Sequence, residues 1–309
     1  MARETFEDWI AVETGDVAIT ALVRESAVEA LGRPEPMASD TKQVPRSGDF
    51  AIAAVAKGSP YGETSGTNDY VELIARKAGG VARIAEEDLL DSSSDILATK
   101  RNDAARNMAK FFDNATLATT GAVNGTTVLY TSVYKAVRTT NSATGYIADA
   151  HYTGSAVTYA GLSATLAFYE DSDWFDEGNT FVIASPSYKA GLRGVVDGEN
   201  RPIFIEGVTG AQQTLFGYPI TWSRGARTSP TNTSSPAGNP ILVVGNRDLL
   251  IKGLAKLTPY IATPNPGFAL QRGNTGVGFL TDEALLKAAM RRGFAVGNEQ
   301  GVAVHEKTS

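Results

Sequence analysis

The stretch DLLDSSSDILATKRNDAARNMAKFFDNATL, residues 88–117, predicts one long helix. Ser92 can cap its start, and Asp95 three positions later gives a capping box with Asp in place of Glu. Gly121 is a plausible end, because glycine often follows the last helical turn. A helix over residues 93–120 would be about 40 Å long at 1.5 Å per residue. Globular helices average about 11–12 residues, so this rod needs a structural reason.

Apolar residues recur along this helix at intervals of three to seven positions and form one stripe. A stripe of this kind usually faces a hydrophobic core. The predicted core residues of the helix are Leu97, Ala104, Met108, Phe111 and Ala115.

The segment before the helix, residues 41–91, predicts a long β-hairpin with strands over residues 50–57 and 70–76. The residues between the strands are rich in turn formers, with glycines, a proline and an asparagine from Gly58 to Asn68. Because a two-stranded ribbon is marginal in water, another surface should cover it. The candidate contacts with a neighbouring molecule are Phe50, Ile52, Lys57, Val71 and Leu73.

Residues 1–40 predict an arm, partly extended and with few packing partners of its own. The stretch GRPEPMASD, residues 32–40, contains two prolines that would break a helix.

Residues 122–245 predict a separate mixed region. Tyr159, Leu162 and Leu166 have helical spacing, TFVIAS (180–185) predicts a buried strand, and RPIFIE (201–206) and PILVVG (240–245) predict further strands. Ser185 followed by Pro186 predicts the start of a second helix.

Composition limits the possible functions. The 309-residue chain has a net charge of −6, which disfavours general binding to nucleic acid. It has no cysteine, and its two histidines are far apart, so thiol chemistry is excluded and neither a metal site nor a cofactor is predicted. The start of the chain does not resemble a signal peptide, and no stretch approaches a membrane span, so we expect the chain to stay in the cytoplasm where it is made.

Motifs for catalysis are weak. The acidic run EDSDWFDE (170–177) lacks the residue order of a calcium loop, and GNTGVG (273–278) lacks the lysine of a phosphate-binding loop. His151 has no identifiable partner as a general base. We therefore predict that the chain is not an enzyme.

The order of parts, rather than any single motif, carries a resemblance. In ARIAEEDLLDSSSDILATKRNDAARNMAKFFDNATLATTG, the box Glu87, Leu89–Ser92 and the helix end Asp113, Ala115 and Gly121 resemble the Hong Kong phage-type major capsid protein of tailed bacteriophages. An acid precedes Asp88 where that family usually has Ser or Thr. The stretches SYKAGLRGVVDGENRPIF, TLFGYPITWS and GFLTDEALLKAAMRRGFAVGNEQGVAV resemble later parts of the same fold.

The resemblance implies an α+β fold in four parts. These are an N-terminal arm (1–40), an extended loop or β-ribbon (41–91), a peripheral domain with the spine helix (92–121 and 246–309), and an apical domain (122–245). Residues 281–292 stay open, because their periodicity favours a helix whereas the family implies a strand.

The implied function is that of a structural shell subunit. Copies of the chain would form the hexamers and pentamers of an icosahedral head that encloses double-stranded DNA without binding it specifically. The resemblance implies a separate scaffolding protein, because only about 40 residues precede the ribbon. The other implied partners are a portal protein and an optional decoration protein, with no membrane. The protein would be assembled in the host cytoplasm and end in the virion.

The same resemblance leaves one alternative function and one chemical feature open. An encapsulin-like bacterial nanocompartment shell has this fold and encloses enzyme cargo. Some family members also weld neighbouring subunits by an isopeptide bond, for which Lys57 with Asn265 or Asn274 is a candidate set.

Overall fold

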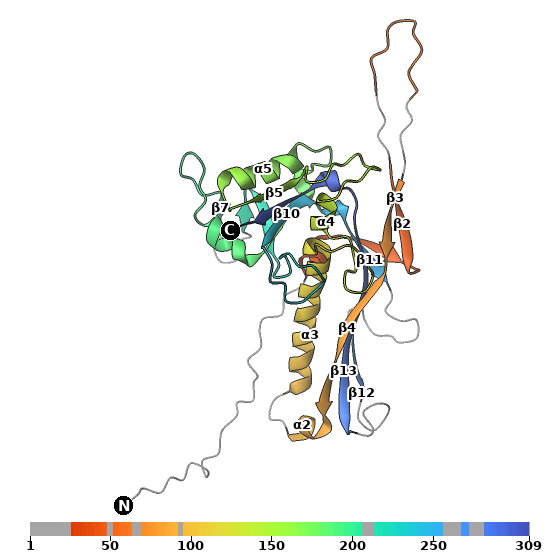
Figure 1. The fold of residues 1–309 in the computed structure, drawn as a ribbon, viewed down its shortest axis with the longest axis vertical. Helices are drawn as coiled ribbons and strands as arrows, with labels where there is room; N and C mark the ends of the chain where they lie inside the picture. The colour runs from red at the N-terminus through yellow and green to blue at the C-terminus, as the bar shows by residue number, and fades with distance from the viewer. Residues whose placement is uncertain are drawn as a thin grey trace, which may run out of the picture.

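The computed structural model describes residues 26–47, 52–63, 69–91, 95–205, 213–255, 267–271 and 281–308. Predicted features at Phe50, Ser92, Asn265 and Asn274 lie outside these residues. Figure 1 shows an elongated molecule, with the hairpin β2/β3 and a group of long strands on one side and a mixed α/β region on the other.

A seven-stranded sheet forms the mixed region, in the order β5-β14-β10-β6-β9-β8-β7. Strand β6 is buried along its whole length, as its run of apolar residues predicted. The strands are β5 (Tyr152–Ser155), β6 (Thr180–Ala184), β7 (Phe204–Ile205), β8 (Thr214–Leu215), β9 (Tyr218–Trp222), β10 (Ile241–Asn246) and β14 (Val302–Lys307).

Short helices surround this sheet. The prediction of a helix at Tyr159 is confirmed, and the start at Ser185 is confirmed as a 3₁₀ turn with Pro186 at its first position, although Ser185 makes no side-chain capping bond. The helical elements are α4 (Val133–Val137), α5 (Tyr159–Glu170), α6 (Lys189–Leu192) and the 3₁₀ turns η3 (Glu177–Asn179), η4 (Pro186–Tyr188), η5 (Arg247–Leu249) and η7 (Glu299–Gly301).

A second sheet has five strands, in the order β1-β11-β13-β12, with β4 also paired to β13. Its longest member, β13, pairs with β4 along one edge and with β12 and β11 along the other. The strands are β1 (Arg33–Met37), β4 (Arg76–Ala85), β11 (Leu250–Ala255), β12 (Gly267–Gln271) and β13 (Glu283–Val296).

Residues 281–292 therefore lie mostly in a strand, and the helical interpretation of their periodicity is wrong. Ala284, Leu286, Ala288 and Met290 alternate as buried residues along β13. Because partner strands satisfy the backbone on both edges, the ladder outweighs the weak strand propensity of Ala, Lys and Arg.

The spine helix is α3 (Ile96–Asp113), preceded by the short helix α2 (Glu86–Asp91). It begins three residues later than predicted, because the Asp95 carboxylate accepts the Ala98 N–H at 2.9 Å and caps it. It continues as a π-helical turn, η2 (Asn114–Ala118), and ends before Thr120. The 18-residue helix lies beside β4 and β13 (Figure 1).

The arm is more firmly packed than predicted over its described part. Helix α1 (Ala27–Leu31) buries Ala27 and Val28 in the main core, and β1 pairs in parallel with β11. Strand β1 contains Pro34 and Pro36, which are tolerated because β1 is an edge strand.

Strands β2 (Thr41–Arg46) and β3 (Asp69–Ile74) form the hairpin. The predicted strand over residues 50–57 is wrong for its described residues, 52–57, which belong to no strand. Three strands also lie outside the parts predicted for them: β1 of the arm and β4 of the extended loop join the five-stranded sheet, and β14 joins the seven-stranded sheet.

Candidate functional site

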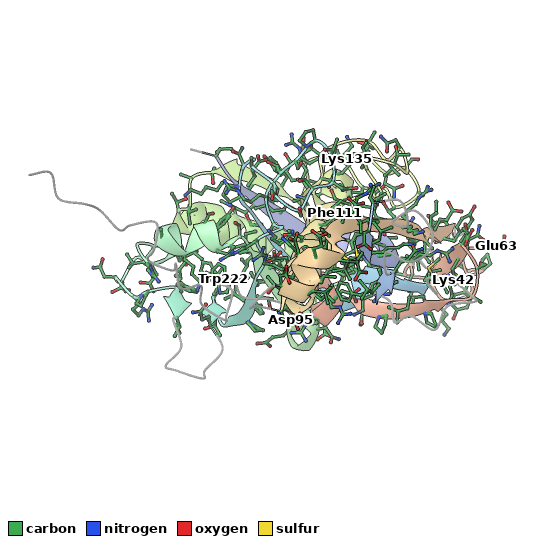
Figure 2. All side chains as sticks on the ribbon, turned by 90° about the horizontal axis from the view of Figure 1, so that it is seen from below. Lys42, Glu63, Asp95, Phe111, Lys135 and Trp222 are labelled. Carbon is green, nitrogen blue, oxygen red and sulfur yellow. The ribbon has the colours of Figure 1, made fainter. Side chains whose placement is uncertain are left out.

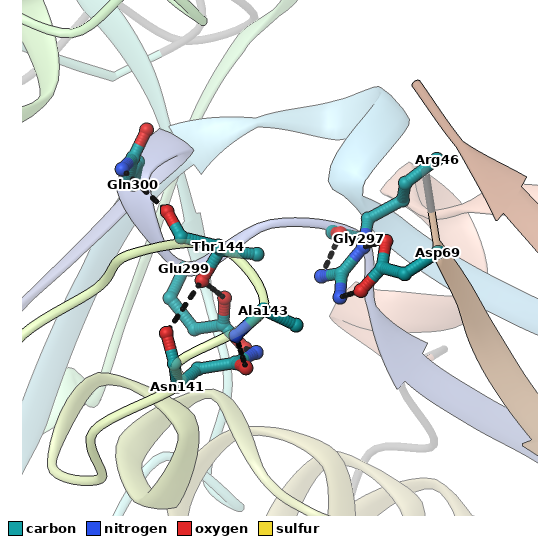
Figure 3. A network of polar contacts seen from close by, with 8 residues as sticks. All are labelled: Arg46, Asp69, Asn141, Ala143, Thr144, Gly297, Glu299 and Gln300. Carbon is teal, nitrogen blue, oxygen red and sulfur yellow. Dashed lines mark hydrogen bonds and ion pairs between the residues drawn. The ribbon is translucent and has the colours of Figure 1, made fainter. Parts of the chain in front are cut away.

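The loop of the hairpin is held at its base, where it leaves the two strands, by an arginine. Arg46 and Asp69 are the last pair of the β2/β3 register, and the Arg46 Nε donates to Asp69 Oδ1 at 2.8 Å. A second guanidinium nitrogen bonds the other carboxylate oxygen, and Nη1 donates to the Gly297 carbonyl at 3.0 Å (Figure 3). The hydrogen bond from Arg46 holds the pKa of Asp69 below its usual value. One side chain thus closes the hairpin and ties it to the end of β13.

A second polar group faces this base. The buried Glu299 accepts hydrogen bonds from Asn141 Nδ2 at 3.0 Å and Thr144 Oγ1 at 3.2 Å (Figure 3). A cavity of about 340 Å³ lies between, with Arg46 and Glu299 in its lining. The base of the hairpin loop therefore lies at the junction between the two sheets.

The hairpin loop, residues 52–63, extends beyond β2 and β3 away from the rest of the molecule (Figure 1). Ile52 is 89% exposed and Tyr61 is 87% exposed, and Lys57 is exposed beside the Gly58 turn, where φ is +88°. Large apolar side chains on a projecting segment are typical of a contact surface.

Two predicted contact residues are corrected. Val71 is 9% exposed and Leu73 is fully buried, packed in a core cluster with Met37, Ile251 and Ala295 of this same chain. The alternation seen in the sequence is present, but the chain's own five-stranded sheet covers that face. Neither side chain offers surface to a neighbour.

The carboxyl end of α3 is a buried polar hub, which we define as Asp113 with Ser26, Ala27, Val28 and Ser223. The Asp113 carboxylate accepts N–H bonds from Ala27 at 3.1 Å and Val28 at 3.2 Å, and hydroxyl bonds from Ser26 and from Ser223, the latter at 2.5 Å. Burial raises the pKa of Asp113, and the donated hydrogen bonds oppose this shift. The hub joins the arm, the spine helix and the loop after β9.

A glycine completes the hub. A Cβ on Gly225 would lie 2.6 Å from the Lys110 carbonyl oxygen and 2.8 Å from the Asn114 nitrogen, so only glycine lets this loop approach the helix end. Asn114 Nδ2 donates to the carbonyls of Gly225 at 3.2 Å and Arg227 at 2.9 Å. Sequence reasoning noted Asp113 as a motif position but missed its partners, because they are 85 or more positions away.

The apolar stripe of the spine helix is only partly buried. Ala115 is fully buried, and Met108 and Phe111 are half-buried against the main core. Leu97 and Ala104 are likewise only partly buried. The largest buried side chain of the helix is Phe112, 1% exposed, which the predicted stripe omitted. Figure 2 looks along α3 from its amino end, with Trp222 on one side and Lys42 and Glu63 on the other.

Both histidines have structural surroundings. His151 stacks on Phe168 with ring centroids 5.9 Å apart, and its Nδ1 lies 3.1 Å from the Val302 carbonyl. The neighbouring Asp149 pairs instead with Arg138 at 2.8 Å. Burial lowers the pKa of His151 and lowers that of His305 to about 4, so both rings are neutral at pH 7.

The acidic run at 170–177 also serves the fold. Asp176 caps the turn η3 by accepting the Gly178 N–H at 3.0 Å, and Glu170 accepts the Tyr218 hydroxyl at 3.0 Å. Within the described part of the chain, no group of three or more His, Cys, Asp or Glu side chains is placed to hold a metal ion. No helix among the described residues is long and apolar enough to cross a membrane.

The spine helix beside long strands, the projecting hairpin and the separate seven-stranded sheet define the class of protein: a Hong Kong phage-type capsid fold. The chain is similar in fold to solved structures from tailed phages. One from Microbacterium phage Oxtober96 is 16% identical with a TM-score of 0.67, covering 96% of each chain. One from Mycobacterium phage Ogopogo is 14% identical with a TM-score of 0.68, covering 100% of each chain.

The Phage capsid family profile matches residues 9–306, and the chain belongs to that family. It is a major capsid protein, a structural subunit of a viral shell. A search of curated proteins finds no match. Nothing in the comparisons supports the alternative of a nanocompartment shell.

Proposed function

We propose that copies of this chain assemble as hexamers and pentamers into the icosahedral head of a tailed phage, around double-stranded DNA. One observation carries the proposal: the hairpin loop presents Ile52 and Tyr61 to solvent, beyond a base fixed by Arg46. A loop anchored at its base and apolar beyond it suits a contact with the next subunit. Many such modest contacts together stabilise a shell while each stays reversible during assembly.

The proposed domain organisation keeps the four parts predicted from the sequence. Strands β1 and β4 are now assigned to the peripheral domain and β14 to the apical domain. Of the predicted contact residues, Ile52 and Lys57 keep that proposed role. Phe50 keeps it as a prediction from sequence alone. A separate scaffolding protein, a portal and a decoration protein are the proposed partners, and no catalytic turnover is expected.

The experiment compares two double variants of the full chain. Ile52→Ser with Tyr61→Ser should leave the circular dichroism melt unchanged, because both side chains are exposed, and should reduce closed particles at least tenfold in sedimentation. Val71→Ala with Leu73→Ala is the matched control, because its side chains are buried and should cost about 2–5 kcal/mol of folding free energy before assembly begins.

Normal particles from the Ile52/Tyr61 variant would remove the loop from the proposed interface. Replacing residues 57–68 with a short turn tests the same role more severely, with the same expected separation of fold and assembly. Electron microscopy of the native protein should show closed icosahedral particles. Purified particles should contain linear DNA rather than protein cargo.

Covalent welding is a separate point. Lys57 is exposed near the loop turn, as a cross-linking lysine must be before assembly. Denaturing electrophoresis of mature particles checks it: we expect a single band near 32.6 kDa, and ladders above that mass would establish cross-links.

A further inference from the structure

A groove runs between the spine helix and the strands β4 and β13. Its volume is about 620 Å³, within the range of about 300–1,000 Å³ in which proteins bind ligands and peptide side chains. Ala104, Met108 and Phe111 line it on the helix, and Leu286 and Met290 line it on β13. These helix residues belong to the predicted core stripe, and they are only partly buried.

The groove is positively charged as well as lined by apolar side chains. Among the residues that the structure describes, two charged residues line it, Lys77 and Lys100, and both are exposed cations. Neither has an acidic partner among the residues that the structure describes. An occupant should therefore combine large apolar side chains with acids.

The chain itself contains such a segment before the first described residue. Residues 4–12, ETFEDWIAV, carry the large apolar residues Phe6, Trp9 and Ile10 together with three acids and no base. Residues 1–25 as a whole have six acids and two arginines. The composition of this segment thus complements both features of the groove.

The anchor of the arm places the segment within reach. Ser26 is bonded to Asp113 at the carboxyl end of α3. Ala104 lies nine residues back along the helix, or about 14 Å at 1.5 Å per residue. The 17 residues from Trp9 to Ser26 span about 25 Å even if fully helical, and more if extended.

We propose that the acidic, aromatic segment at residues 4–12 docks in this groove of its own subunit. Its aromatic side chains would cover the stripe at Ala104 and Met108, and its acids would pair with Lys77 and Lys100. This goes beyond the proposed shell contacts and does not depend on them, because the contact forms within one chain. It explains why a stripe with core-like spacing is left half-covered by the remaining residues.

Disulfide trapping tests the proposal without background, because the natural chain has no cysteine. Trp9→Cys is combined with Ala104→Cys in the full chain, and oxidation is followed by non-reducing electrophoresis. We expect an intrachain bond, seen as a faster-migrating monomer, to form at least tenfold faster than in the control pair Trp9→Cys with Ile147→Cys. Ile147 is 72% exposed and lies outside the groove.

Equal rates in the two pairs, or bonds only between chains, would overturn the proposal. The pair Tyr61→Cys with Ala104→Cys asks whether a neighbour's hairpin loop takes the groove instead, and its trapping in place of the intrachain bond would also overturn it. Charge reversal is a second measurement: Lys100→Glu should slow trapping several-fold, and adding Asp8→Lys should restore it. Absence of that restoration would remove the lysine pairing from the proposal.

Discussion

The two halves of the molecule differ in how completely their side chains are buried. The closed half, which we define as the seven-stranded sheet with the carboxyl end of α3, buries large side chains and polar groups together, as at Phe112 and Asp113. The open half, defined as β4, β12, β13 and the amino-terminal half of α3, leaves Leu97 and Ala104 only partly buried. The spine helix is therefore firmly packed at its carboxyl end and only partly covered at its amino end. Stability is concentrated in the first half, and surface for partners in the second.

The largest expected contrast is between two adjacent phenylalanines. Phe112→Ala should cost about 3–5 kcal/mol of unfolding free energy, because its ring is 1% exposed. Phe111→Ala should cost only about 1–2 kcal/mol, because its ring is half-buried and lines the groove. Urea unfolding of the soluble subunit measures both. Equal costs would mean that the open half is packed as firmly as the closed half.

The polar hub gives the next effect. Asp113→Asn replaces one acceptor oxygen by a donor that faces other donors, and should cost about 2–4 kcal/mol. Asp103→Asn is the control on the same helix: this half-exposed carboxylate pairs with Arg106 at 3.1 Å and should cost less than about 0.5 kcal/mol. The difference in urea midpoint is the measurement. A hub variant as stable as the control would show that the arm does not need its anchor.

The closed half should also respond to acid. His305 is fully buried, with Tyr188 and Ser155 at its ring nitrogens, and its pKa is lowered from 6.5 to about 4. The unfolded chain therefore binds this proton first, so stability is lost as pH falls from 6.5 towards 4, by up to about 3 kcal/mol.

The contribution of His305 can be separated from that of Glu306. The pKa of Glu306 is lowered in the folded protein, so its contribution to stability is lost only as the pH falls below the ordinary glutamate pKa of 4.5. His305→Gln should flatten the unfolding free energy between pH 6.5 and 5 relative to the native chain. A variant with the native slope would assign the acid response to other groups.

A small mutational effect is expected for an apolar side chain of the open half. Leu97→Ala should cost about 1 kcal/mol or less, because the side chain is half-exposed near the start of the helix. Thermal melting by circular dichroism checks it. A cost similar to that of Phe112→Ala would contradict the open character of this half.

No effect is expected from metal removal, since no described cluster of His, Asp or Glu is placed to bind an ion. A chelator should leave the melting temperature and particle integrity unchanged. A large drop in either would contradict the prediction and show that the protein binds a metal.

The sequence by itself determined the existence of the spine helix, the buried strands at 180–184 and 241–246, and the break at the two prolines. These features depend on local periodicity, on proline geometry and on residue types, which act over a few neighbouring positions. The order of parts was also readable, because it needs no contact to be known.

Only the tertiary structure decided which surfaces are covered. Residues 283–296 became a strand because β4, β11 and β12 satisfy both of its edges, although Ala284, Leu286, Ala288 and Met290 carried an alternation that could have indicated it. Leu73 turned inward because the chain's own sheet lies beneath it. Asp113 became a hub because donors from positions 26–28 and 223 meet at one helix end. Such contacts join residues far apart in the sequence, and no local pattern encodes which of them will meet.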